Sequence, residues 1–437
     1  MARIQKELFG WQEIDALGDL ERLQLVRDQL PDEALVQCLE RQRGKGRDDY
    51  PVRAIWNSLL AGVVYQHPSI ASLRRELLRN GQLRQLCGFR PALGEQAVPP
   101  ASAYSRFLKR LADHVEPVEL IFHRLVELLG QELPGFGDLL AMDGKALPTH
   151  ARPRRKGQPT PKADGRRDLD ANFGCKKQVE VDQDGVERVV NKYWYGYKGH
   201  FVVDGRYELP VAYEITKASV AEQPQAQRLL DQIARHHPWL LERCGELVAD
   251  KGYDDGKLIT RLWDEHEIKA VIPIRDLWKD GEETRKVGKF ADVVYDYQGE
   301  VFCHETAGTR HRMAFAGFEA DRETLKYSCP AQRYGFACSR LGRCQIGKSA
   351  RIPLAEDRRV FTPLARSSKA WKRVYKKRTA VERFNSRLDV SFGFEEHFIR
   401  GLTKMRLRMG LSLIVMLGLA VGRLKQRQAE KLRSLVA

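Results

Sequence analysis

The segment Trp371-Lys-Arg-Val-Tyr-Lys-Lys-Arg-Thr-Ala-Val-Glu-Arg-Phe-Asn-Ser-Arg-Leu-Asp389 has the periodicity of one amphipathic helix. In a helix, residues three and four positions apart share a face. One face of this helix carries mainly polar and aromatic side chains: Trp371, Tyr375, Arg378, Glu382, Asn385 and Asp389. The strip beside it is apolar and is expected to dock the helix on a core; it consists of Val374, Val381, Phe384 and Leu388.

Glu382 is the single acid in a strongly basic stretch. Nine Lys or Arg residues lie between Arg366 and Arg387, ends included. The carboxylate of Glu382 would repel a nearby phosphate or carboxylate unless a cation lay between them. A metal ion is one candidate for that cation. The alternative is a solvated basic helix with one incidental Glu.

Two further acids follow short apolar runs. Phe136-Gly-Asp-Leu-Leu-Ala-Met-Asp143-Gly-Lys and Gly245-Glu-Leu-Val-Ala-Asp250 each predict a buried strand with a carboxylate at its exposed end. An Asp-Gly pair is also common in loops, so Asp143 alone is weak support for a site. The repetition of the pattern at Asp250 favours a shared role for the two acids.

The elements around these acids predict a mixed α/β domain. Residues 195–216 alternate in polarity around a turn, which indicates an antiparallel hairpin. Residues 223–235 and 255–266 have helical periodicity, and residues 269–274 predict another strand. The order is therefore three strands, a helix, the Asp250 strand, a helix and a final strand.

Tyr375-x2-Arg378-x3-Glu382 resembles the C-terminal signature of DDE transposases of bacterial insertion sequences, Tyr-x2-Arg-x3-Glu-x6-Lys. Asp389 stands where that signature has Lys, and Arg387 is the candidate substitute. Ala249-Asp250-Lys-Gly-Tyr253-Asp is also similar to the second-aspartate motif of the family. The resemblance extends over residues 50–425 and implies an α/β fold: a mixed sheet core like that of ribonuclease H, with a helical N-terminal domain and a β-rich insertion before the catalytic helix.

We therefore predict four segments. Residues 1–130 form a helical DNA-binding domain, residues 131–275 the first part of the catalytic core, residues 276–368 the insertion, and residues 369–437 the C-terminal helices of the core. The insertion is expected because 106 residues separate Asp143 from Asp250 but 131 separate Asp250 from Glu382, more than the core needs.

The N-terminal segment contains short helices that carry basic residues. A helix is predicted over residues 51–64, another begins at a Ser69 cap and ends at Asn80-Gly81, and a third follows Pro99-Pro100. Candidate phosphate contacts are Arg74, Arg75, Arg106, Lys109 and Arg110. The alternative is an ordinary helical bundle with solubilising charges.

Residues 148–198 are rich in charge, Pro and Gly and predict a long loop or hairpin that clamps the backbone of a substrate. Its basic residues include Arg152, Arg154, Arg155, Lys156, Arg166 and Arg167. Arg167-Asp168-Leu-Asp170-Ala resembles part of the same family. Asp164, Asp168 and Asp170 are alternative metal-binding acids.

The predicted insertion contains Cys329-x8-Cys338-x5-Cys344, with Cys303, His304 and His311 upstream. These residues are sufficient for a tetrahedral Zn²⁺ site, which needs four nitrogen or sulfur ligands. No Cys-x2-Cys pair is present, so the spacing is not diagnostic, and free thiols are the alternative.

The chain has 437 residues and a net charge of +16, which favours a polyanionic partner. The most apolar run, residues 411–421, is short for a membrane span, and the N-terminus Met1-Ala-Arg-Ile-Gln-Lys-Glu has no apolar signal core. We expect a cytoplasmic, nucleoid-associated protein with no membrane partner. The eight cysteines are then free thiols or metal ligands.

Phosphodiester chemistry with two metal ions needs several carboxylates, and Asp143, Asp250 and Glu382 fit that need. The resemblance implies two Mg²⁺ or Mn²⁺ ions, hydrolysis at the ends of the element and attack of the freed 3′-hydroxyl on target DNA. It also implies double-stranded DNA and a second copy of the chain as partners. The expected DNA contacts are Tyr375, Arg378, Lys376, Lys377, Arg387 and Arg106. The alternatives are a metal-dependent nuclease without strand transfer and an inactive DNA-binding protein.

Overall fold

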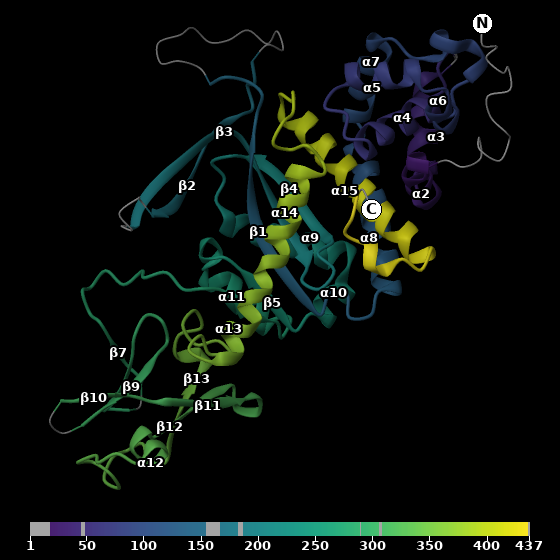
Figure 1. The fold of residues 1–437 in the computed structure, drawn as a ribbon. Coiled ribbons are helices and arrows are strands. Elements are labelled where there is room, and N and C mark those ends of the chain that lie inside the picture. Colours follow the sequence, from purple (N-terminus) through teal and green to yellow (C-terminus); the bar gives the residue numbers. More distant parts are fainter. Residues whose placement is uncertain are drawn as a thin grey trace, which may run out of the picture. The chain divides into compact units, whose positions relative to one another are not determined.

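The computed structural model describes residues 18–44, 49–153, 167–181, 187–288, 290–305 and 308–435 (Figure 1). Several residues considered above lie outside this part of the chain: 1–7, Arg154, Arg155, Lys156, Asp164 and Arg166. The chain forms two compact units. The first unit contains residues 1–134, 147–197 and 386–437, and the second contains residues 135–146 and 198–385. The four predicted segments divide the chain differently and stay a prediction.

The N-terminal part of the first unit is helical where the structure describes it. Its α-helices are α2 (Glu21–Gln29), α3 (Glu33–Arg43), α4 (Val52–Val64), α5 (Ile70–Arg79), α6 (Gly81–Cys87), α7 (Ala101–Ala112) and α8 (Val115–Glu132). Ser69 caps α5 as predicted, because its hydroxyl accepts a hydrogen bond from the backbone N–H of Ser72 at 3.1 Å. Asn80 ends α5 and also caps α6, a helix that the sequence reading did not separate.

Helix α15 (Leu402–Lys425) is the core helix of the first unit and packs against α2, α4 and α8. α15 is long and apolar enough to cross a membrane. The apolar run at residues 411–421 is only part of this helix, so the length of the helix was underestimated from the sequence. However, 89% of its most apolar window is buried inside the protein. Two short 3-10 turns, η1 (Gly18–Leu20) and η7 (Ala429–Lys431), also belong to this unit, as does η2 (Pro91–Ala97).

A six-stranded sheet has the order β2-β3-β1-β5-β6, and β4 also pairs with β3. Its strands are β1 (Leu139–Pro148), β2 (Asn172–Val181), β3 (Glu187–Asp204), β4 (Pro210–Lys217), β5 (Glu246–Ala249) and β6 (Lys269–Val271). β2 and β3 form an antiparallel hairpin, and β5 is parallel to both β1 and β6. The sheet is therefore mixed, and the α/β class predicted from sequence is confirmed.

The helices of the second unit connect these strands. α9 (Glu222–His236) and α10 (Pro238–Arg243) follow β4, and the turn η3 (Lys251–Tyr253) with α11 (Gly256–Asp264) follows β5. One prediction needs correction here. β1 does not end at Asp143 but continues to Pro148. Its pairing with β5 ends at Met142, but β1 also pairs with β3 on its other side.

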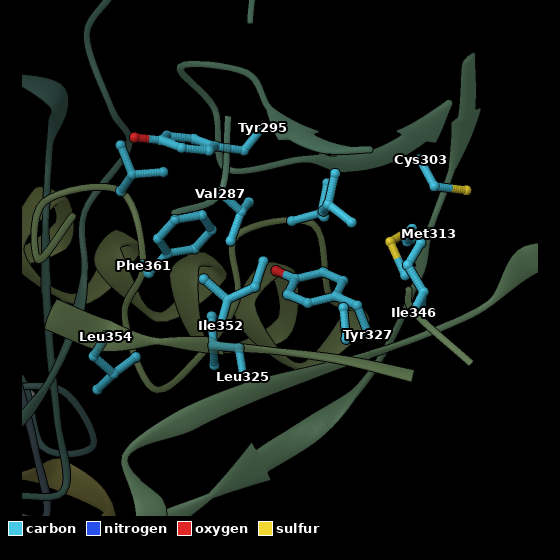
Figure 2. Close-up of a cluster of buried hydrophobic side chains, with 14 of the residues drawn as sticks. Val287, Tyr295, Cys303, Met313, Leu325, Tyr327, Ile346, Ile352, Leu354 and Phe361 are labelled. Atoms are coloured by element: carbon cyan, nitrogen blue, oxygen red, sulfur yellow. The ribbon is translucent and has the colours of Figure 1, made fainter. Parts of the chain in front are cut away.

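Residues between β6 and residue 368 form two small antiparallel sheets. β7 (Arg285–Lys286), β8 (Val293–Tyr295), β9 (Val301–His304) and β10 (Arg310–Arg312) make one; β11 (Ala314–Glu319), β12 (Thr324–Ser328) and β13 (Ser349–Pro353) make the other. The short helix α12 (Pro330–Tyr334) and the turns η4 (Ala320–Arg322) and η5 (Leu354–Glu356) complete this part. Figure 2 shows its own buried cluster, in which Tyr295, Tyr327 and Phe361 are the largest side chains.

The helix predicted over residues 371–389 is not continuous. It consists of α13 (Lys369–Tyr375), the 3-10 turn η6 (Lys376–Arg378) and α14 (Thr379–Val390). The predicted apolar strip is buried at Val381, Phe384 and Leu388, all 0% exposed, whereas Val374 is only partly buried. α13 packs against β5 and β6, and η6 packs against β5. This packing positions the polar face near the end of β5.

Candidate active site

Two parallel strands bring Asp143 and Asp250 to the same edge of the sheet in the second unit. β1 and β5 pair in register from Leu139 opposite Glu246 to Met142 opposite Ala249. Asp143 and Asp250 are the next residues of the two chains, so they leave the parallel ladder side by side. The side chain of Asp143 is buried, and Asp250 is partly buried.

Arg378 connects Glu382, on the helical segment, to Asp143. The guanidinium Nη2 of Arg378 lies 2.5 Å from Glu382 Oε1, and its Nη1 lies 4.0 Å from Asp143 Oδ2. Asn385 Nδ2 donates a hydrogen bond to the same Asp143 oxygen at 3.4 Å. Arg378, Glu382 and Asn385 therefore face one way, as the spacing predicts, although η6 interrupts the helix.

The pKa values of Arg378 and Tyr375 show how strongly charged this region is. Burial lowers the pKa of Arg378, but the neighbouring Tyr375 phenol and the charges of Glu382, Asp143 and Asp250 outweigh it, and the pKa is raised. Burial raises the pKa of the Tyr375 phenol; the nearby Arg378 opposes this, while Asp250 and Glu382 add to it. All three predicted acids thus act on one guanidinium.

The rings of Trp371 and Tyr375 hold this segment in place. They are stacked with centroids 4.8 Å apart and 15° between their planes. The guanidinium of Arg378 lies over the Tyr375 ring, 5.8 Å from its centroid. The aromatic pair therefore orients Arg378 toward the carboxylates across the turn η6.

Asp254 anchors the loop that follows Asp250. Its side chain is fully buried and accepts hydrogen bonds from Arg359, with Nη2 2.7 Å from Oδ2, and from the backbone N–H of Arg275 at 2.7 Å. Sequence reading did not single out this pair, because a buried Asp and an Arg 105 positions away share no local pattern. The pair ties the loop after β5 to the segment that follows β13 and η5.

Glu222 is a further acid that sequence reading missed. It is the first residue of α9, and its Oε1 lies 3.5 Å from Lys198 Nζ on β3. A Cβ atom built on Gly252 would lie 2.1 Å from Glu222 Oε2. Glu222 therefore lies against the segment that carries Asp250. The only available signal was an acid in the first turn of a helix, which usually reflects the helix dipole.

The donor set of this region fits a hard divalent cation. Asp143, Asp250 and Glu382 supply carboxylate oxygens, which Mg²⁺ prefers, and the cationic guanidinium of Arg378 already lies among them. Within the described residues, no three His, Cys, Asp or Glu side chains are grouped so that they could hold a metal ion. Arg378 contacts Glu382 and Asp143 in this arrangement instead.

Comparison with protein families gives a match to the transposase DDE domain over residues 134–417, about two thirds of the chain. The chain belongs to the DDE transposase family. No curated protein matches the sequence. Among solved structures, this transposase is similar to the cryo-EM structure of the piggyBac transposase synaptic complex with hairpin DNA, at 11% identity and a TM-score of 0.40, over 98% of this chain and 81% of that chain.

The other basic residues predicted to contact DNA lie in different places. Lys376 and Lys377 are exposed on η6 in the second unit. Arg106 is exposed on α7 in the first unit. Arg387 also belongs to the first unit, where its Nη1 donates to the carbonyl oxygen of Arg433 at 3.3 Å.

The alternative acids Asp168 and Asp170 have structural partners in the first unit. Both oxygens of Asp168 accept from Tyr197 at 2.6 Å, and Oδ2 also accepts from the Gly401 N–H at 2.8 Å. Burial raises the pKa of Asp168, but these hydrogen bonds and one from Thr149 lower it overall. Asp170 Oδ2 accepts from the N–H of Leu402 at 3.1 Å. The two acids therefore hold the start of α15.

The four cysteines of the candidate zinc site approach one another in the second unit. All are free thiols, and Cys303 and Cys329 are buried. Burial, together with the neighbouring Cys329, Cys338 and Cys344, raises the pKa of the Cys303 thiol to about 11. Cys329, Cys338 and Cys344 thus lie near enough to affect Cys303, although, among the residues described, the four cysteines form no group that could hold a metal ion.

Proposed function

We propose that this transposase cuts DNA at the ends of an insertion sequence and joins the freed 3′ ends to target DNA. The observation that carries the proposal is the register of β1 and β5, which brings Asp143 and Asp250 together, with Arg378 connecting Asp143 to Glu382. These three acids are the proposed catalytic residues. Their elements belong to the same compact unit of the chain.

Asp143, Asp250 and Glu382 would hold two divalent ions, Mg²⁺ or Mn²⁺. When bound, such a pair supplies activation of the attacking oxygen and stabilisation of the leaving oxygen in phosphodiester chemistry. The acids themselves have different settings: Asp143 is 7% exposed, whereas the side chain of Glu382 is 47% exposed. Asp143 and Asp250 are therefore the less exposed acids of the proposed site, and Glu382 faces solvent.

The basic residues around the acids bind and orient DNA in this proposal. Tyr375 and Arg378 lie next to the carboxylates and would position the phosphate to be cut. Lys376 and Lys377 on the exposed turn η6 would neutralise neighbouring phosphates. Arg106 and Arg387, in the other unit, are proposed as further contacts to the DNA backbone.

We extend the proposal to the fold and the partners. The sheet, with the antiparallel β2–β3 hairpin and with β5 parallel to both β1 and β6, supports a ribonuclease-H-like core with an inserted β domain. The net charge of +16 supports double-stranded DNA as the partner, both at the element ends and at the target. Two copies of the chain would hold the two ends in a synaptic complex, in the nucleoid of the cytoplasm.

We also propose a structural Zn²⁺ ion for the insertion. The effect of Cys329, Cys338 and Cys344 on the pKa of Cys303 supports this proposal. Four sulfur donors suit tetrahedral zinc, and the thiolates that zinc requires would form on metal binding. The two small sheets share one modest core, for which a metal crosslink would add stability.

The rival function is DNA cleavage without joining. The decisive experiment incubates the protein and Mg²⁺ with a labelled linear duplex that carries the inverted repeat flanking the gene, together with a supercoiled target plasmid. We expect labelled target, in which the duplex end is covalently joined. Cut duplex with unlabelled target would establish a nuclease, and an uncut duplex bound by the protein would establish an inactive DNA-binding protein.

A further inference from the structure

The carboxylate of Glu222 lies against both segments that carry the paired aspartates. A Cβ atom on Gly144, the residue after Asp143, would lie 3.0 Å from Glu222 Oε1. A Cβ atom on Gly252, two residues after Asp250, would lie 2.1 Å from Glu222 Oε2. One side chain from the start of α9 therefore reaches the backbone beside each acid.

The close approach of the Glu222 carboxylate explains why positions 144 and 252 are both glycine. Neither Gly144 nor Gly252 has a positive φ, so their backbone conformations are open to other residues. The three atoms nearest to a Cβ at Gly144 all belong to Glu222, and those nearest to a Cβ at Gly252 belong to Glu222 and Asp250. Any larger residue at either position would push the Glu222 carboxylate away from the aspartates.

A buried hydroxyl at the same place lacks a partner. Tyr253 is 0% exposed, and its hydroxyl makes no hydrogen bond within the described residues. Burial raises its pKa, and the charges of Glu222, Asp143 and Asp250 raise it further. A buried hydroxyl without a partner is costly. This unpaired hydroxyl, three residues after Asp250, is the second observation that points to a bound species at this place.

We propose that Glu222 is a fourth carboxylate of the divalent-metal site, acting together with Asp143 and Asp250. This proposal rests on the proposed function, because it assumes that these aspartates bind the metal. Lys198 Nζ lies 3.5 Å from Glu222 Oε1 and also donates to the carbonyl of Val220 at 3.1 Å. Lys198 is thus a cationic partner of Glu222.

The test is a Mn²⁺ titration of the full-length protein without DNA, in which electron paramagnetic resonance measures the free ion. Glu222→Gln keeps the size of the side chain and removes its charge, so we expect Mn²⁺ affinity to fall by about 10- to 100-fold. Glu242→Gln is the matched control, since Glu242 is exposed on α10, and its affinity should be that of the native protein. Asp143→Asn and Asp250→Asn are titrated in parallel.

Two further variants separate metal binding from a purely structural role of Glu222. Gly144→Ala displaces the Glu222 carboxylate without removing any charge, so it should weaken Mn²⁺ binding, and it should have no added effect in a Glu222→Ala background. Lys198→Gln removes the salt-bridge partner but also a competing cation, so Mn²⁺ should bind as tightly or more tightly. A structural salt bridge would instead make Lys198→Gln resemble Glu222→Gln.

The outcomes distinguish the two proposals. If both aspartate variants lose Mn²⁺ affinity while Glu222→Gln and Gly144→Ala retain it, the metal site stands and the role of Glu222 is overturned. If none of the acidic variants changes the affinity, the placement of the metal site in the proposed function is itself wrong. Should Glu222→Gln fail to fold, Gly144→Ala alone decides, because it leaves every charged group in place.

Discussion

Arg378 holds Glu382, with Nη2 2.5 Å from Oε1 one helical turn away. The cation that the charge pattern around Glu382 requires is therefore a side chain of the same segment. The same guanidinium lies 4.0 Å from Asp143, and the charge of Asp250 also acts on it. In the proposed function a divalent ion needs the same carboxylates, so Arg378 and the metal would compete for them unless a DNA phosphate draws Arg378 away.

Arg378→Gln should therefore have opposite effects on the two ligands. Loss of a cation beside three carboxylates is expected to tighten Mn²⁺ binding about tenfold, or about 1.4 kcal/mol, in the absence of DNA. DNA binding should weaken, because a guanidinium that contacts phosphate is lost. Titrations of Mn²⁺ and of DNA check the two effects, with Arg373→Gln on the exposed side of α13 as the control. Unchanged Mn²⁺ affinity would mean that the metal binds elsewhere.

The exposed turn η6 gives a prediction about salt dependence. Replacing both Lys376 and Lys377 by Ala removes two cations without touching a carboxylate, so DNA binding should weaken at low salt. The slope of log affinity against log salt should fall by about 1.8, since each phosphate contact contributes about 0.9. Gel-shift titrations at several salt concentrations measure the slope. An equal change on replacing Lys425 and Lys431 at the C-terminal end would show a general charge effect rather than local contacts.

The ion pair between Arg359 and the buried Asp254 leads to a prediction about stability. Arg359→Met leaves the fully buried carboxylate of Asp254 without its principal cation and should lower the free energy of unfolding by about 3 kcal/mol. Arg358→Met is the matched control, because Arg358 pairs with the more exposed Asp264 and Glu323 and should cost below about 1 kcal/mol. Urea unfolding followed by tryptophan fluorescence compares the two variants. Equal losses would show that Asp254 does not depend on Arg359.

The sequence predicted the parts of the fold that depend on local patterns. The strands before Asp143 and Asp250 follow from apolar runs, and the Ser69 cap and the face shared by Arg378, Glu382 and Asn385 follow from spacing. Periodicity also predicts the burial of Val381, Phe384 and Leu388. These features need only neighbouring residues, which is why a single sequence is sufficient to find them.

Features that depend on tertiary contacts were missed. The break at η6 has no Gly or Pro to mark it, since Lys376, Lys377 and Arg378 all favour helices. The continuation of β1 beyond Asp143 depends on its partner strands and not on its own residues. Glu222 and the Asp254–Arg359 pair are brought to the site by folding, so sequence distance concealed them.

The proposed zinc site at Cys303, Cys329, Cys338 and Cys344 leads to a prediction about bound metal. Protein purified without chelator should contain one Zn²⁺ per chain, and Cys338→Ser should lose it and lower the melting temperature of the insertion. Cys175→Ser is the control, because Cys175 is exposed on β2 outside the insertion. Elemental analysis measures the metal. Absence of zinc from the native protein, with four thiols titrated rapidly by a thiol reagent, would establish free cysteines.

The most direct test of the central claim is cleavage by Glu382→Gln, measured with Mg²⁺ on linear DNA that carries the end of the element, beside a gel shift on the same DNA. The account predicts that cleavage and joining are lost while DNA binding is retained or slightly increased, because one negative charge is removed and the basic residues remain. Glu396→Gln, at an exposed position beyond α14, should cleave normally. Full cleavage by Glu382→Gln would contradict the account and show that the third catalytic acid is another residue.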